Sequence, residues 1–233
     1  DGFANDWGLE DAIVVADDSG SMFQMASGSS SVMAIEICNS LAIYFAGQLH
    51  GVFHNKAVTF SDRPRFIDLK EHTSLKDKLE IMFAHNEMSN TNIEAVFDLL
   101  LAMAECEDVP REELPKQVLI ISDMEFDEAT ASGYPWEKKR KPVNDTLFAR
   151  IAEKYEAAGY QMPRLIFWNV CGRTDTIPMV NNGEGLCLLS GFSQNAMKIT
   201  ADQTKKEPYE ALLQVLDSPR YQAIGDAILP WTA

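Results

Sequence analysis

Two unbroken apolar runs limit the fold of this chain more than any other feature. Ala12–Ala16 and Val118–Ile121 are apolar at every position, and each run is followed within two residues by an aspartate, Asp17 and Asp123. A short run of this kind is typical of a strand that is buried on both faces. Such strands occur in parallel sheets whose faces are covered by helices. The two runs therefore predict the central strands of an α/β sheet.

Segments with helical spacing alternate with the apolar runs. Between Ser31 and Leu49, the residues Met33, Ile37 and Leu41 recur at the spacing of an amphipathic helix. Strands that alternate with helices predict a doubly wound, Rossmann-like sheet with helices on both faces. We expect further helices at Leu75–Phe83, Ile93–Ala104, Val143–Ala158 and Tyr209–Leu216, and further strands at Leu165–Trp168 and Gly185–Leu189.

One hairpin is expected at an edge of this sheet. Lys56–Phe60 and Arg65–Leu69 are separated by the turn-rich segment Ser61–Pro64, which favours an antiparallel connection. The whole pattern predicts a six-stranded, mostly parallel sheet with one antiparallel edge strand, in the order 3-2-1-4-5-6.

Length and composition indicate an ordinary globular domain. With 233 residues, 46% hydrophobic and 24% charged, the chain can bury a full core, and we expect one domain over residues 1–233. No segment reaches the roughly 18 to 20 apolar residues of a membrane span, and no signal peptide is recognisable. Because the sequence starts without Met and enters a strand almost at once, we expect a domain excised from a longer protein.

The cysteines and the net charge narrow the class of protein. Cys38, Cys106, Cys171 and Cys187 form no CxxC pair and lie in or beside apolar runs, so buried reduced thiols and a cytoplasmic location are expected. The net charge of −15 disfavours direct binding to nucleic acid. The basic run Lys138–Lys141 is interpreted as a solvated loop, with an anion-binding patch as the alternative.

Three polar segments follow or face the carboxyl ends of the predicted strands. Asp17–Ser21 comes directly after the first strand, Ser89–Asn92 precedes the helix from Ile93, and Asp123 ends the strand that begins at Val118. In open α/β sheets, ligands bind beyond the carboxyl ends of the strands, where the strand order reverses. We therefore expect the three segments to meet at one site.

The side chains of these segments favour a hard divalent cation. They offer hydroxyl and carboxylate oxygens, which suit Mg²⁺, with Mn²⁺ or Ca²⁺ as alternatives, and give no advantage to zinc or copper. Ser19, Ser21 and Thr91 are neutral, so only Asp17 and Asp123 carry charge. A cation held in this way keeps positive charge and an open position, which the carboxylate of a protein partner can fill.

The pattern DxSxS…T…D resembles the metal-ion-dependent adhesion site of the von Willebrand factor A family. The five matching residues, each taken as a metal ligand, are Asp17, Ser19, Ser21, Thr91 and Asp123. The resemblance covers nearly the whole chain. It implies a domain that binds a protein partner through a divalent cation, and no enzyme activity.

A narrower resemblance concerns three segments outside the motif. Ser122–Asp127, Phe167–Asn169 and Leu189–Ser193 are similar to segments of a family of uncharacterised proteins in which an A-type domain follows a helical region. That layout resembles the Ro (TROVE) RNA-binding proteins. The resemblance implies a place in a ribonucleoprotein-type assembly, with RNA bound only through the neighbouring helical domain.

Other acidic residues and other functions stay open at this point. Asp18, Glu125 and Asp127 add charge near the motif and are expected to contact ligand waters or to face solvent. Asp17–Ser21 also has some likeness to the DxDGT signature of phosphatases in which the first Asp is the nucleophile, but Ser19 replaces the second acid. No GxxxxGK[ST] or GxSxG motif occurs. A module whose cation is purely structural is the third alternative.

Overall fold

The computed structural model describes residues 11–27, 31–86, 92–123, 145–171 and 186–190, with only the backbone of 145–146 and 186–190. All of them belong to one compact unit, residues 9–192. Residues 1–8 and 193–233 group as another unit, which lies outside the described residues. The expectation of one domain over residues 1–233 therefore stays a prediction, as does the helix at Tyr209–Leu216.

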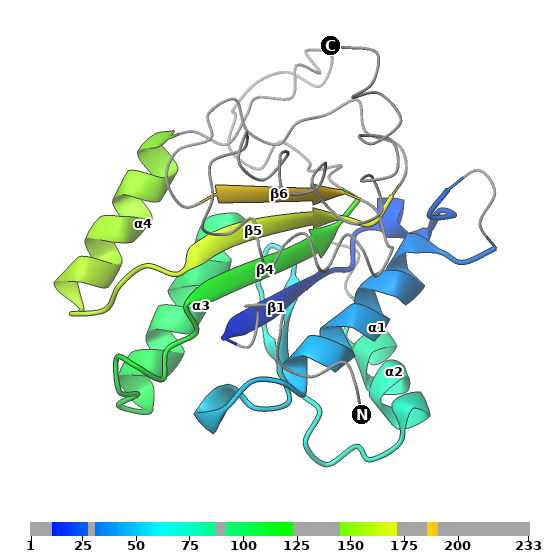
Figure 1. Cartoon of the computed structure of the whole chain (residues 1–233), viewed down its shortest axis with the longest axis horizontal. Coiled ribbons are helices and arrows are strands. Elements are labelled where there is room, and N and C mark those ends of the chain that lie inside the picture. The colour runs from blue at the N-terminus through cyan, green and yellow to red at the C-terminus, as the bar shows by residue number, and fades with distance from the viewer. Residues whose placement is uncertain (1–10, 28–30, 87–91, 124–144, 172–185, 191–233) are drawn as a thin grey trace, which may run out of the picture. The chain divides into compact units, whose positions relative to one another are not determined.

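The described strands form one mixed, mostly parallel sheet (Figure 1). They are β1 (Ala12–Asp17), β2 (Lys56–Phe60), β3 (Phe66–Asp68), β4 (Gln117–Ser122), β5 (Arg164–Asn169) and β6 (Leu186–Ser190). Their order is β3-β2-β1-β4-β5-β6, and the pair β2–β3 is antiparallel while the other pairs are parallel. The predicted α/β class, the strand order and the antiparallel edge strand are confirmed within this part of the chain.

Four α-helices are described, and three of them begin at residues whose hydrogen bonds cap the first turn. They are α1 (Ala34–Ala46), α2 (Leu75–Ala84), α3 (Ile93–Cys106) and α4 (Asp145–Ala157), with short 3₁₀ turns η1 (Gly20–Phe23) and η2 (Gly51–Phe53). The side chains of Ser74 and Asn92 accept hydrogen bonds from the first turns of α2 and α3. Glu36 accepts from the backbone N–H of Met33 at 2.8 Å, so α1 begins at Ala34 rather than at the predicted Ser31.

Alternate residues of each strand pack on opposite faces of the sheet. On one face, Val15, Ile120 and Phe167 belong to a buried cluster that also includes side chains of α3 and α4. On the other face, α1 contacts β1, β2 and β4, and the ring of Phe45 meets the ring of Trp168 edge-on at 6.2 Å. Side chains alternate with a period of two, so the last residues of β1, β4 and β5 lie on the α3 face.

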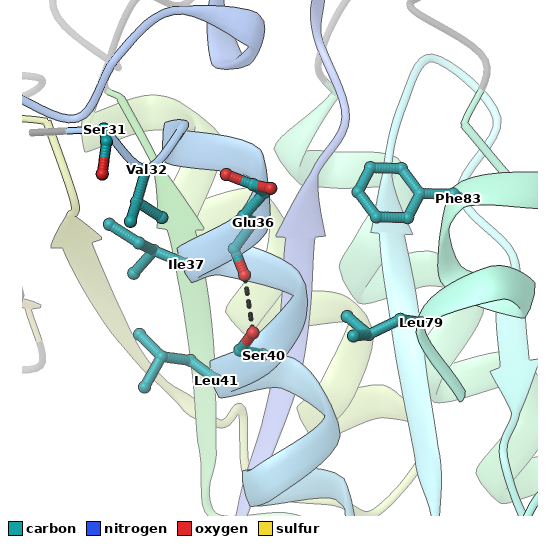
Figure 2. Close-up of a pocket in the computed structure, with 8 residues that line it drawn as sticks. All are labelled: Ser31, Val32, Glu36, Ile37, Ser40, Leu41, Leu79 and Phe83. Atoms are coloured by element: carbon teal, nitrogen blue, oxygen red, sulfur yellow. Dashed lines mark hydrogen bonds between the residues drawn. The ribbon is translucent and has the colours of Figure 1, made fainter. Parts of the chain in front are cut away.

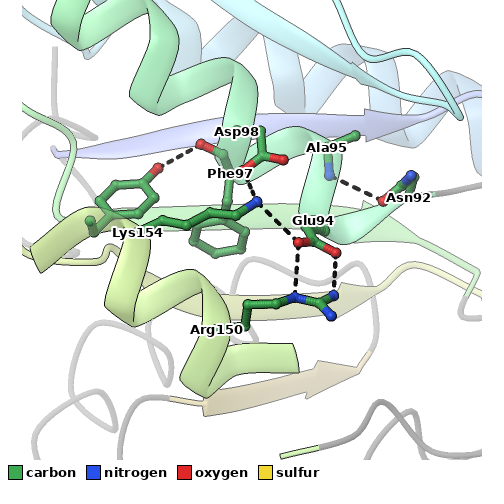
Figure 3. Close-up of polar contacts among 8 residues, drawn as sticks. Asn92, Glu94, Ala95, Phe97, Asp98, Arg150 and Lys154 are labelled. Carbon is green, nitrogen blue, oxygen red and sulfur yellow. Dashed lines mark hydrogen bonds and ion pairs between the residues drawn. The ribbon is translucent and has the colours of Figure 1, made fainter. Parts of the chain in front are cut away.

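The helices α3 and α4 are joined by a cluster of polar contacts (Figure 3). Glu94 of α3 accepts hydrogen bonds from Arg150 and Lys154 of α4, and Lys154 also donates to Asp98 at 2.6 Å. In the same cluster, the buried Tyr155 hydroxyl donates to the backbone carbonyl of Phe97 at 2.9 Å. These contacts fix the helix that follows the predicted ligand Thr91.

Two expectations from the sequence concern the burial of the cysteines and the absence of a membrane span. Cys38 and Cys171 are buried free thiols, as expected, but Cys106 is exposed because it ends α3 on the side away from the core, so the prediction was wrong for Cys106. Within the part of the chain that the structure describes, no helix combines the length and the apolar character that a membrane crossing needs.

Candidate metal centre

The carboxyl ends of β1 and β4 bring two of the predicted ligands together. The two strands are parallel neighbours, with Ala16 paired to Ile121, and Asp17 and Asp123 follow these residues by one and two positions. Both aspartates are 1% exposed. Two carboxylates from segments more than one hundred residues apart in the sequence are thus buried at the same edge of the sheet.

Asp17 is held on both oxygens yet is poorly stabilised as an anion. Its Oδ1 accepts from the backbone N–H of Ser19 at 2.9 Å, and its Oδ2 accepts a short hydrogen bond from the Ser122 hydroxyl. Burial raises the pKa of Asp17 from 3.8 to about 7, and the negative charge of Asp123 adds to the rise, while hydrogen bonds from Ser122 and Ser19 lower it. None of the described residues that shift the pKa of Asp17 is basic, so no positive side chain stabilises its carboxylate. A cation bound here would stabilise the anionic form.

The two serines of the motif lie at a distance that suits a shared cation. Ser19 Oγ and Ser21 Oγ are 3.0 Å apart, and the turn η1 holds Ser21. In an octahedral Mg²⁺ shell with bonds of 2.0–2.1 Å, neighbouring oxygens are about 2.9 Å apart. The two hydroxyls are hydrogen-bonded to each other, and the separation of their oxygens also matches one edge of such an octahedron.

Asp123 is anchored by a residue that sequence reasoning missed. Gln24, directly after η1, donates from Nε2 to Asp123 Oδ2 at 3.0 Å. This hydrogen bond ties the loop that carries Ser19 and Ser21 to the end of β4. Because the Gln24 amide is neutral, it orients the carboxylate of Asp123 without cancelling its charge.

Thr91, the fifth predicted ligand, lies outside the described residues, and its role stays a prediction. The described chain resumes one residue later at Asn92, which caps α3 by accepting from the backbone N–H of Ala95 at 3.1 Å. Glu125, Asp127 and the basic run Lys138–Lys141 also lie outside the described residues.

The carboxyl edge of the sheet buries more polar residues than the motif contains. Ser61 after β2, Asp18 after β1, Ser122 at the end of β4 and Asn169 at the end of β5 are all at most 7% exposed. Asp18 is therefore buried and does not face solvent. A sequence signal for Ser122 and Asn169 existed, because each directly follows a buried apolar run in the same way as Asp17.

The chemistry of this edge fits a hard cation better than zinc. Among the described residues, no group of three or more His, Cys, Asp and Glu side chains is placed to hold a metal ion. The candidate set consists instead of two carboxylates and neutral hydroxyls. Oxygen donors with little formal charge fit Mg²⁺, which keeps several waters and few protein carboxylates.

A groove elsewhere on the described surface has a different character. Between α1 and α2, a groove of about 500 Å³ is lined mainly by apolar side chains, including Val32, Ile37, Leu41 and Phe83 (Figure 2). Its one carboxylate, Glu36, already caps the start of α1. The groove offers no cluster of ligating oxygens, so the carboxyl edge of the sheet remains the candidate site.

Comparisons with known proteins identify the fold and leave the activity open. A family model described as a domain of unknown function, DUF7788, matches residues 11–222. The uncharacterized protein L728 of Acanthamoeba polyphaga mimivirus is 28% identical over 192 residues, which are 82% of this chain and 32% of that protein. The chain thus spans about a third of the length of this curated relative.

Two solved structures are similar in fold. The Ro (RSR) protein of Deinococcus radiodurans matches with a TM-score of 0.50 and 14% identity, over 83% of this chain and 34% of that chain. The SpRpn10 VWA domain matches with a TM-score of 0.42 and 12% identity, over 83% of this chain and 94% of that domain, which is too distant to support a conclusion by itself. With its strand order, the described part of the chain has a von Willebrand A-like fold.

Proposed function

The chain belongs to the DUF7788 family, and we propose that it is a protein-binding domain that acts through one divalent cation of the Mg²⁺ class. The side chains that would hold the cation are Asp17, Ser19, Ser21, Thr91 and Asp123. When bound, the cation supplies a positive charge with an open position, which the acidic group of a partner completes.

The observation that carries the proposal is the burial of two carboxylates at one edge of the sheet. Asp17 and Asp123 are each 1% exposed, and the pKa of Asp17 rises to about 7 mainly because burial removes water from its carboxylate. A buried carboxylate is stabilised by a cation or by a proton. At neutral pH, a divalent cation coordinated by both aspartates supplies that charge, while the hydroxyls of Ser19 and Ser21 add neutral oxygens.

The same residues favour binding over turnover. In the phosphatase alternative, Asp17 is the nucleophile and a second acid protonates the leaving group. Ser19 stands where that signature has the second acid, so no group at this position can protonate a leaving group. We therefore propose that the domain is not an enzyme.

We propose a wider setting from the resemblance to the Ro (TROVE) layout, in which a helical region accompanies an A-type domain. In such an assembly, we expect the helical region to hold RNA. The net charge of −15 supports this division, because it repels phosphate backbones from the domain described here. The free thiols Cys38 and Cys171 support a cytoplasmic location.

Affinity capture tests the proposal. The full chain is immobilised as wild type, Asp17→Ala and the control Glu80→Ala, whose carboxylate is 66% exposed on α2. We expect partners captured in Mg²⁺ to be lost in EDTA and with Asp17→Ala, and kept with Glu80→Ala. The same proteins captured by wild type and Asp17→Ala would contradict cation-mediated binding. If Asp17→Ala also lowers the melting temperature strongly, that result would favour a structural cation.

A further inference from the structure

The last residues of three neighbouring strands form a polar row along the carboxyl edge of the sheet. Asp17, Ser122 and Asn169 end β1, β4 and β5. Ser122 pairs in register with Asn169, and the Ser122 hydroxyl donates a hydrogen bond to Asp17. The candidate metal centre thus lies at one end of this polar row.

Asn169 is the member of this row whose hydrogen bonding is incomplete. Its side chain is buried, with 3% of the residue exposed, and its Oδ1 accepts from the backbone N–H of Cys171 at 2.8 Å. That N–H needs an acceptor, so the bond identifies which amide atom is oxygen. The Nδ2 group has no hydrogen-bond partner among the described residues. A buried donor without a partner is costly and is rare in native proteins.

The position of Asn169 indicates what its missing partner is. In-register residues of parallel strands lie on the same face, so Asn169 shares the α3 face with Ser122 and Asp17. Neighbouring strands lie about 4.8 Å apart, which places Asn169 one strand beyond the pair that carries Asp17 and Asp123. An N–H donor cannot bind a cation, but it can bind an oxygen of an anion that sits on the cation.

We propose that Asn169 is a further ligand-binding residue, whose Nδ2 donates a hydrogen bond to a carboxylate of the partner held at the metal centre. This inference rests on the proposed function. The partner's carboxylate would then make two contacts. One of its oxygens would bind the cation held by Asp17 and Asp123, and the other would accept a hydrogen bond from Asn169. The site then favours a ligand with two acceptor oxygens, such as a carboxylate, over a ligand with a single oxygen, because one oxygen contacts the cation and the other accepts from Asn169.

The variant Asn169→Asp separates this role from a structural one. Aspartate keeps the oxygen that accepts from the Cys171 N–H and replaces the Nδ2 donor by a negatively charged acceptor. The added charge attracts the cation and repels the ligand. We therefore expect Mg²⁺ affinity to be unchanged or higher, and affinity for acetate in the presence of Mg²⁺ to fall by about tenfold or more. A merely structural defect would lower both.

The experiment uses the full chain, with Mg²⁺ and acetate as probes. Calorimetry gives the Mg²⁺ affinity, and ¹⁵N–¹H spectra follow the side-chain amide of Asn169 and the acetate titration. The control Asn55→Asp adds the same charge at the start of β2, at the opposite end of the sheet. We expect the Asn169 amide signal to shift when acetate is added in Mg²⁺, and acetate affinity to be normal in Asn55→Asp.

Three outcomes would overturn the inference. Equal acetate affinity of wild type and Asn169→Asp in Mg²⁺ would remove Asn169 from the ligand site. A shift of the Asn169 signal with Mg²⁺ alone, and no further shift with acetate, would identify a water on the cation as its partner. Both of these outcomes leave the proposed metal centre intact. Failure of wild type to bind Mg²⁺ would end both proposals.

Discussion

At Asp17, hydrogen bonds from Ser122 and Ser19 do not offset the cost of burial. The pKa of this carboxyl rises from 3.8 to about 7, so without a cation the folded protein binds a proton here more tightly than the unfolded chain does. The folded state therefore gains stability from this group below about pH 4 and loses it as the pH rises through about 7. The sign is opposite to that of an ordinary paired aspartate.

Asp17→Asn tests this balance of charge. In EDTA at pH 8, the neutral amide avoids the buried charge, so we expect the variant to be more stable than wild type by about 1 to 3 kcal/mol. Urea unfolding at pH 5 and pH 8 measures the difference. Wild type should lose stability between these pH values, and the Asp17→Asn variant should not. A rise in wild-type stability over this interval would show that hydrogen bonding outweighs burial at this site.

The sequence predicted where four of the five candidate ligands lie, while their role as ligands stays a proposal. Asp17 and Asp123 are buried at the predicted edge, and Ser19 and Ser21 lie side by side in the loop after β1. Gln24 could not be predicted, because its contact with Asp123 depends on how the loop after η1 turns back toward β4. The unpaired Nδ2 group of Asn169 could not be predicted either, because the orientation of this amide depends on the hydrogen bond that its oxygen accepts from the backbone N–H of Cys171.

At the scale of helices and strands, the cores of the elements were predictable, but α1 starts three residues later and ends three residues earlier than predicted. The predicted helix from Ser31 starts at Ala34, because the residues before it form an isolated antiparallel β-bridge between Met25 and Met33. In this bridge the N–H of Ala26 donates to the carbonyl of Val32, and the N–H of Ala34 donates to the carbonyl of Gln24. Helical periodicity in the sequence cannot reveal a bridge of this kind. The caps Ser74 and Asn92 follow rules that do operate locally, so α2 and α3 begin where the sequence indicated.

The pairing of α3 with α4 depends more on one buried hydroxyl than on the exposed ion pairs. Tyr155 is 1% exposed, and loss of its hydroxyl in Tyr155→Phe leaves the carbonyl of Phe97 without this partner. We expect Tyr155→Phe to cost about 1 to 2 kcal/mol of unfolding free energy. The side chain of Arg150 is 56% exposed, so Arg150→Ala should cost less than about 1 kcal/mol. Denaturant unfolding of both variants checks the order, and a larger loss with Arg150→Ala would reverse it.

At the scale of the molecule, strand order is what assembles the site. The order β3-β2-β1-β4-β5-β6 makes β1 and β4 neighbours, although β1 ends at Asp17 and β4 begins only at Gln117. Alternating strands and helices with a single hairpin were enough to predict this arrangement. The partner could not be predicted, because it depends on surfaces and domains beyond the motif.

The most direct test of a cation centre at the ends of β1 and β4 is a calorimetric titration of the full chain with Mg²⁺. Wild type should bind one Mg²⁺, and at one hundred times the dissociation constant the ion should stabilise the fold by about 2.7 kcal/mol. Asp17→Asn, which we expect to fold at least as well, should show neither effect. Equal Mg²⁺ binding by wild type and Asp17→Asn, or none by wild type, would contradict the proposed centre.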